Sequence, residues 1–152
     1  MSAGIDPAKQ QQLAAIEQRI NEMVQQSRVL EAYMNDIMTR QVTVSKLMEE
    51  ARLASTTIQN ITSDSEVESL MPVGIGVYVK TTVPPIKKLL VNLGASVAVE
   101  KNREDTLNYV EARIKEYEVA ARQLEAQRQE IAMRMDQIQA QVNQMIRAAQ
   151  QG

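Results

Sequence analysis

Two long segments of the sequence repeat apolar residues in alternating steps of three and four. In residues 13–58, eleven of 14 such positions are apolar, and in residues 107–149, twelve of 13 are. A repeat that averages 3.5 residues keeps one stripe of a helix facing a partner, which is the pattern of a coiled coil. The sequence therefore predicts two long helices, and the stripe on each is called the seam. The first seam is Leu13, Ile16, Ile20, Met23, Ser27, Leu30, Met34, Ile37, Gln41, Val44, Met48, Ala51, Ser55 and Ile58, and the second is Leu107, Val110, Ile114, Tyr117, Ala121, Leu124, Arg128, Ile131, Met135, Ile138, Val142, Met145 and Ala149.

The two seams fit each other in antiparallel order. When residue i is paired with residue 165 − i, every position of the second seam meets a position of the first, from Ile58 with Leu107 to Ile20 with Met145. A register shifted by one heptad also pairs seam with seam. The rise of 1.5 Å per residue predicts arms on the order of 70 Å long, with both chain termini at the same end.

Two long polar side chains, Gln41 and Arg128, interrupt the apolar seams. The register places Gln41 opposite Leu124 and Arg128 opposite Ile37, one layer apart. A buried polar layer can fix the alignment of a coiled coil. Alternatively, Arg128 lays its aliphatic stem across the seam and keeps its charge in water. The pattern favours neither interpretation over the other.

Residues that favour helix starts and turns set the limits of these helices. Asp6 can cap a helix that opens at Pro7, and Asn102 can cap a second helix with Asp105 in its first turn. We expect helices over residues 8–60 and 102–150 of a single domain that spans residues 1–152. The first helical pattern stops at a run of turn-forming residues, Thr62, Ser63, Asp64 and Ser65.

The segment between the helices, residues 68–101, has the pattern of two β-hairpins. Short β-branched runs flank Gly74-Ile75-Gly76 and Gly94-Ala95-Ser96, and Pro84-Pro85 separates the two pairs. The first turn lacks the third glycine and the following helix of a dinucleotide-binding loop, so we interpret it as a hairpin turn. Isolated hairpins are marginal in water, and their open edges need partner strands. We therefore expect them to hold subunits together through Val73, Val77, Val79, Leu89, Val91, Leu93, Val97 and Val99.

The composition argues against several classes of function. The chain has no His and no Cys, which makes a metal site improbable, and its net charge of −2 offers no electrostatic attraction for nucleic acid. The adjacent carboxylates of Glu49-Glu50 and Glu104-Asp105 diverge on a helix, so we expect no catalytic constellation, no cofactor and no enzyme activity. No signal peptide or membrane span is recognisable, and we expect a soluble cytoplasmic protein without contact to a membrane.

Two stretches of the hairpin segment carry a specific resemblance. Residues 71–80, Met-Pro-Val-Gly-Ile-Gly-Val-Tyr-Val-Lys, and residues 91–101, Val-Asn-Leu-Gly-Ala-Ser-Val-Ala-Val-Glu-Lys, resemble the prefoldin family. Helix, two hairpins and helix is the plan of its alpha-class subunit, whereas the beta class has one hairpin. The resemblance implies an ATP-independent holdase chaperone, a hexamer of two alpha-class and four beta-class subunits, so that a second copy of this chain is a partner. It further implies that the hairpins complete a β-barrel platform, and that the arm tips bind unfolded polypeptides and deliver them to a group II chaperonin.

The ends of the two predicted helices are rich in glutamine and poor in charge. Fifteen of the 17 glutamines lie before residue 29 or after residue 122. Apolar residues persist there both in the seam and outside it. Seam residues are explained as ordinary coiled-coil core, and single exposed apolar residues are common, so a client-binding role depends mainly on the resemblance. The candidates are Leu13, Ile16, Ile20, Val24, Met133, Val142, Met145 and Ile146.

A second class of function fits the same architecture. A structural or tethering scaffold would use its hairpins for assembly and its arms for specific partners. Only a holdase would suppress the aggregation of an unrelated denatured protein, so that assay separates the two hypotheses.

Overall fold

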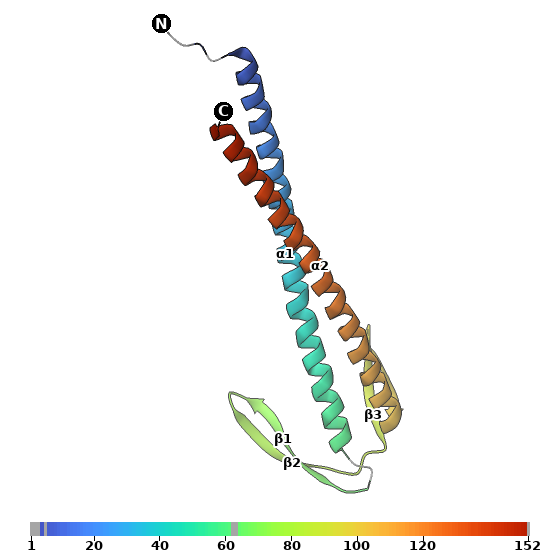
Figure 1. The fold of residues 1–152 in the computed structure, drawn as a ribbon. Coiled ribbons are helices and arrows are strands. Elements are labelled where there is room, and N and C mark those ends of the chain that lie inside the picture. Colours follow the sequence, from blue (N-terminus) through green and yellow to red (C-terminus); the bar gives the residue numbers. More distant parts are fainter. Residues whose placement is uncertain (1–3, 5, 62–63, 152) are drawn as a thin grey trace. The chain divides into compact units, whose positions relative to one another are not determined.

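A computed structural model describes residues 4, 6–61 and 64–151, and Thr62 and Ser63, which were expected to end the first helix, lie outside them. The prediction of a mostly helical chain with two long helices and two antiparallel β-hairpins is confirmed (Figure 1). The elements in chain order are α1 (Pro7–Asn60), β1 (Val67–Gly74), β2 (Val77–Val83), β3 (Lys88–Gly94), β4 (Val97–Asn102) and α2 (Arg103–Gln151).

The chain divides into two compact units, each built from paired segments of both helices. Residues Met1–Thr43 and Ala121–Gly152 form the terminal unit, and Val44–Ala120 form the central unit, which contains the hairpins. In the terminal unit, Met23, Ile37, Leu124 and Val142 are buried. In the central unit, Ile58 and Ile114 are buried together with the hydroxyls of Ser55 and Thr106.

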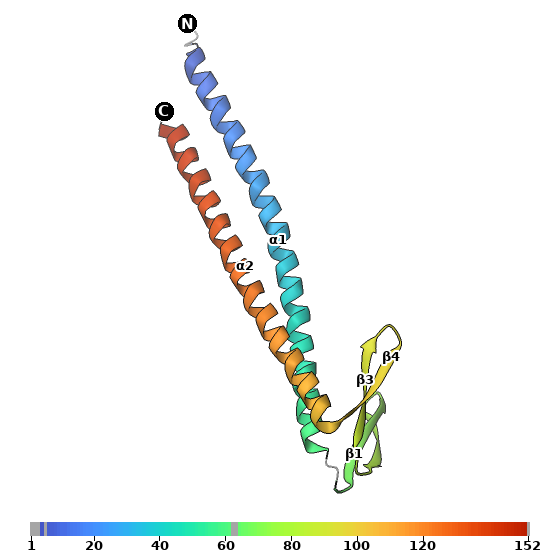
Figure 2. The ribbon, with the colours of Figure 1, turned by 90° about the vertical axis from the view of Figure 1, so that its right-hand side faces the viewer.

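The burial pattern confirms the predicted seams. Apart from Leu13 at the start of α1 and Arg128, every seam position is buried or half-buried. Helices α1 and α2 run antiparallel within each unit (Figures 1 and 2). The cross-helix hydrogen bonds agree with the predicted register, since Gln41 bonds to Glu125 and Ser55 bonds to Glu111, each next to its expected partner position.

Both predicted helix starts are confirmed by capping hydrogen bonds. The side-chain oxygen of Asp6 accepts a hydrogen bond from the backbone N–H of Ala8 at 3.2 Å. The side-chain oxygen of Asn102 accepts one from the backbone N–H of Asp105 at 2.7 Å. These bonds satisfy N–H groups that have no partner within the first turn of a helix.

A polar cluster joins the end of α1 to the beginning of α2. The guanidinium of Arg103 donates to the backbone carbonyls of Ile58 at 3.1 Å and Gln59 at 2.9 Å. The hydroxyl of Ser55 donates to the carboxylate of Glu111 at 2.6 Å. The last carbonyls of a helix lack partners and carry the negative end of its dipole. Arg103 therefore caps α1 from the neighbouring helix.

This cap leads to a prediction about stability. Replacing Arg103 by Met keeps much of the aliphatic stem and removes the charge and both hydrogen bonds. We expect the free energy of unfolding to fall by about 1–2 kcal/mol, because the carbonyls of Ile58 and Gln59 lose a charged donor. Urea denaturation followed by the helical circular dichroism signal measures this change. The control is Arg122→Met, at an exposed position of α2, and equal stability of the two variants would contradict the cap.

The two hairpins form separate two-stranded sheets (Figure 2). Strand β1 pairs with β2 from Val67–Val83 to Gly74–Val77, and β3 pairs with β4 from Lys88–Asn102 to Gly94–Val97. A register shift precedes each turn, between Pro72 and Gly74 and between Asn92 and Gly94.

The residues of both turns adopt the left-handed conformation. In the first turn Ile75 has φ 44° between two glycines that also have positive φ, and in the second Ala95 and Ser96 have φ 50° and 63°. A positive φ is unusual outside glycine and is strained for a β-branched residue such as Ile75.

Candidate functional site

The hairpins expose an unusual amount of apolar surface for so small a segment. Of the eight residues predicted to hold subunits together, Val91 is buried and Leu89 is half-buried, while the other six are exposed. Met71 and Val79 are cross-strand partners in the first hairpin, and both are exposed. Ile75, at the turn, is fully exposed. The first hairpin therefore presents apolar side chains that its own sheet does not cover.

The terminal unit contains the residues predicted to bind clients, and the structure divides them into two groups. Among the seam residues, Val142 is buried, Ile16, Ile20 and Met145 are half-buried, and Leu13 is exposed. The three candidates outside the seam are all exposed: Val24, Ile146 and, at 62 % of its surface, Met133. The residues outside the seam are therefore available to a partner without any opening of the helix pair.

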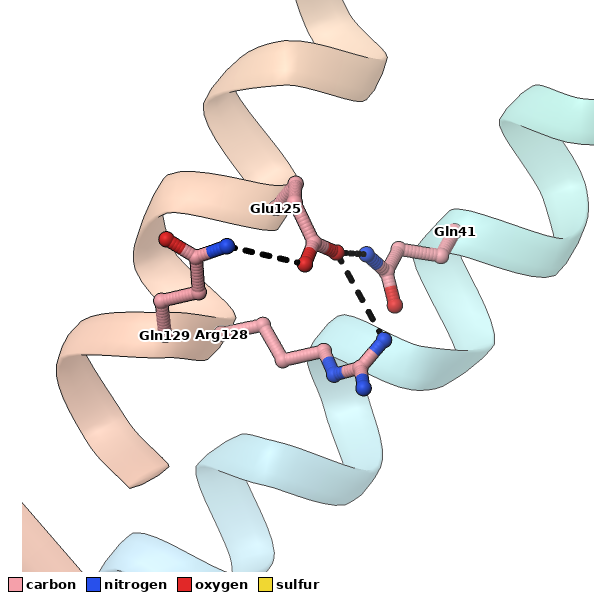
Figure 3. A network of polar contacts seen from close by, with 4 residues as sticks. All are labelled: Gln41, Glu125, Arg128 and Gln129. Carbon is pink, nitrogen blue, oxygen red and sulfur yellow. Dashed lines mark hydrogen bonds and ion pairs between the residues drawn. The ribbon is translucent and has the colours of Figure 1, made fainter. Parts of the chain in front are cut away.

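The two long polar seam residues, Gln41 and Arg128, meet at the carboxylate of Glu125 in the terminal unit (Figure 3). The side-chain amide of Gln41 donates to the carboxylate of Glu125 at 2.9 Å, and Arg128 approaches the same oxygen at 3.5 Å. Gln129 donates to the other carboxylate oxygen at 3.3 Å. Gln41 thus makes a cross-helix polar contact, and the guanidinium of Arg128 reaches the same carboxylate while half of its side chain stays in solvent.

A groove lies between α1 and α2 in the terminal unit. Its volume is about 540 Å³, and its apolar lining consists of Val29, Leu30 and Ile138. The groove is a concave apolar surface in a part of the chain with few charges.

Polar side chains with neutral amides complete the groove. They are Gln25, Gln26, Gln137 and Gln141, and the remaining lining residue is Arg134. The guanidinium of Arg134 forms an ion pair with Glu130 at 2.9 Å, one helical turn away. Amides both donate and accept hydrogen bonds, so this lining can satisfy a polar ligand without selecting its charge.

A second groove, in the central unit, has a different lining. It measures about 330 Å³ and includes Glu50, Tyr109, Arg113 and Tyr117. The guanidinium of Arg113 lies 5.6 Å from the ring centroid of Tyr109. Hydrogen bonding to the Tyr109 hydroxyl, together with the nearby Glu116 carboxylate, raises the pKa of Arg113 above its usual value. This charged and aromatic groove differs from the amide-lined one.

Sequence reasoning missed three features of these surfaces. The groove was not predicted, and Val29, which lines it, is not among the client-binding candidates although it is an apolar residue outside the seam. Glu125 was not identified as the partner of Gln41. Arg103 precedes the second seam, and no periodic pattern indicates its contact with the end of α1.

Two kinds of feature are absent from the described residues. In residues 4, 6–61 and 64–151, no group of three or more acidic side chains is placed to hold a metal ion. None of the helices in this part of the chain is both long and apolar enough to span a membrane.

Comparison with known proteins gave consistent matches over nearly the whole chain. The family model described as "Prefoldin subunit" matches residues 8–148. Prefoldin subunit alpha of Nitrosopumilus maritimus is 38 % identical over 135 residues, which is 89 % of this chain and 93 % of that protein. Prefoldin subunit alpha of Methanospirillum hungatei is 27 % identical over 151 residues, 99 % of this chain and 94 % of that protein.

A solved structure shares the fold. The cryo-EM structure of filamentous PFD from Methanocaldococcus jannaschii superposes with a TM-score of 0.62 at 23 % identity, covering 80 % of this chain and 98 % of that chain.

Proposed function

The chain belongs to the prefoldin family, among its alpha-class subunits, and from this premise we propose that it acts in an ATP-independent holdase. In the proposed cycle, the terminal unit binds non-native polypeptide, prevents its aggregation and delivers it to a group II chaperonin. The complex contains two copies of this chain and four beta-class subunits, and it works in the cytoplasm. The proposal includes the single-domain organisation expected from the sequence. In it, the two long helices are joined through the hairpins, which hold the subunits together.

The observation that carries the proposal is the combination of exposed apolar side chains and low charge at the arm ends, where residues 1–30 and 131–152 contain nine charged residues. Val24, Met133 and Ile146 are exposed on a surface where charged residues are few and several form ion pairs with each other. Apolar surface without strong charge suits non-native clients, because these share exposed apolar residues and differ in sequence. Methionine is unbranched and adapts to partners of irregular shape.

The surface of the hairpins supports the assembly part of the proposal. Six of the eight apolar candidates remain exposed in the single chain, and each sheet has two strands with unpaired outer edges. Such edges pair readily with strands of another chain. In the proposed hexamer these strands complete the β-barrel platform.

Trimming the arm ends tests the holdase. Removing residues 1–20 together with 145–152 deletes Leu13, Ile16, Met145 and Ile146 and keeps the buried Met23 and Val142. Because the retained seam keeps its paired layers, we expect the trimmed chain to assemble with beta-class subunits that are trimmed in the same way. The complex should protect a thermally denatured client several-fold less well, as measured by light scattering.

The control for this experiment changes apolar surface in the central unit. Leu53→Ser with Val119→Ser removes two exposed apolar side chains there and should leave protection unchanged. Full protection by the completely trimmed complex would show that residues 1–20 and 145–152 do not bind clients, and full protection after Val24→Ser and Met133→Ser are added would favour the tethering scaffold.

A further inference from the structure

Two glutamine side chains that line the groove of the terminal unit are spaced like the peptide groups along one edge of an extended chain. We propose that it holds a client segment in extended conformation, with the amides of Gln137 and Gln141 hydrogen-bonded to alternate peptide groups and the client's apolar side chains against Val29, Leu30 and Ile138. This inference rests on the proposed holdase function and names the chemistry that its site recognises.

The first argument is geometric. Gln137 and Gln141 are four residues apart on α2, so their attachment points are about 6 Å apart along the helix axis. In an extended chain the peptide groups on one edge repeat every second residue, about 6.6–6.8 Å. The difference is under about 1 Å, which the flexible glutamine side chains can accommodate. A client segment that runs along α2 can therefore place successive peptide groups at both amides.

The second argument concerns hydrogen-bonding capacity. Gln41, Gln59 and Gln129 use their side-chain amides in contacts within the chain. In the part of the chain that the structure describes, the amides of Gln137 and Gln141 make no such contact, so both can bond to a ligand. Each amide offers a donor and an acceptor, which matches the N–H and C=O of any peptide group. Backbone recognition of this kind is independent of the client's sequence.

The third argument is electrostatic. The only charged residue that lines the groove, Arg134, is paired with Glu130. A lining with one ion-paired charge selects weakly by the charge of the client, whereas the lining of the central groove includes both Glu50 and Arg113. The apolar residues then provide the hydrophobic part of the affinity and the amides fix the orientation of the backbone.

The test uses the full assembled complex and two short, uncharged, dye-labelled probes. One is a peptide with valine at alternate positions, and the other is its depsipeptide, in which ester bonds replace interior amide bonds and remove their N–H groups while the side chains stay the same. Fluorescence anisotropy gives the dissociation constants. We expect the parent complex to bind the peptide roughly 5–30 times more tightly than the depsipeptide, as two hydrogen bonds allow.

The variant Gln137→Ala with Gln141→Ala should bind the peptide weakly and lose the discrimination between the probes. Alanine has the higher helix propensity, so α2 is retained. The matched control is Gln123→Ala with Gln127→Ala, an exposed pair with the same spacing on α2 outside the groove, which should behave like the parent.

Three outcomes would overturn the inference. The first is equal binding of both probes by the parent, and the second is discrimination that survives in the Gln137 and Gln141 variant. If either occurs while the parent still protects a denatured client, the groove assignment is wrong and the holdase stands. The third outcome is a parent complex that neither binds the peptide nor protects the client, and it removes both proposals.

Discussion

Val79→Asp should dissociate the assembly while both helices stay folded. Val79 is 44 % exposed in the single chain and lies beside Met71 on the same face of the first hairpin. A carboxylate at this position remains hydrated in the free subunit and loses its hydration in a subunit interface, which costs several kcal/mol. Association should therefore weaken by a factor on the order of 100 or more.

Sedimentation velocity of the mixed subunits measures this change, and circular dichroism confirms the helices. The matched control is Val119→Asp, because Val119 has the same 44 % exposure but lies on α2. An intact complex that contains Val79→Asp would show that the first hairpin does not hold the subunits together.

Leu124→Asp should unfold the helix pair of the terminal unit. Leu124 is 9 % exposed, and its seam layer lies beside the hydrogen bond between Gln41 and Glu125. The change removes a buried aliphatic side chain and places a charge near the existing carboxylate, so we expect a loss of about 3–5 kcal/mol. Urea denaturation and hydrogen exchange measured along α2 report the loss.

The control for Leu124 uses the same chemical change at an exposed site. Leu53 is 68 % exposed on α1, and Leu53→Asp should cost only the lower helix propensity of aspartate, about 0.5 kcal/mol. Similar losses in the two variants would mean that the seam contributes little to stability.

The periodic parts of the fold could be predicted from the sequence because one physical rule governs each. A repeat of 3.5 residues determines which side of a helix is buried, and Met23, Ile37 and Leu124 follow it. Helix starts at Asp6 and Asn102 depend on local hydrogen bonds, which residue type alone indicates. Residue type alone likewise indicates the hairpin turn at Gly74.

The candidate site could be predicted only in part, since it depends on contacts between side chains beside the seams. Glu125 follows Leu124 by one residue, and only the packed helices bring it to Gln41. The lining residues of the groove come from both helices, so only the packed helix pair brings them together. Val24, Met133 and Ile146 lie outside the predicted seams, and the structure finds them exposed.

Because their turns are left-handed, the hairpins of the proposed assembly depend on partner subunits for their folding. Ile75, Ala95 and Ser96 each adopt a positive φ that is unfavourable by about 1 kcal/mol or more for residues with a side chain. Two-stranded sheets have little stability of their own with which to offset this strain. Partner strands that bind only the ordered hairpin shift its folding equilibrium by mass action. In the proposed assembly, order in residues 67–102 should therefore rise with the concentration of partner subunits, and the melting temperature should change on dilution.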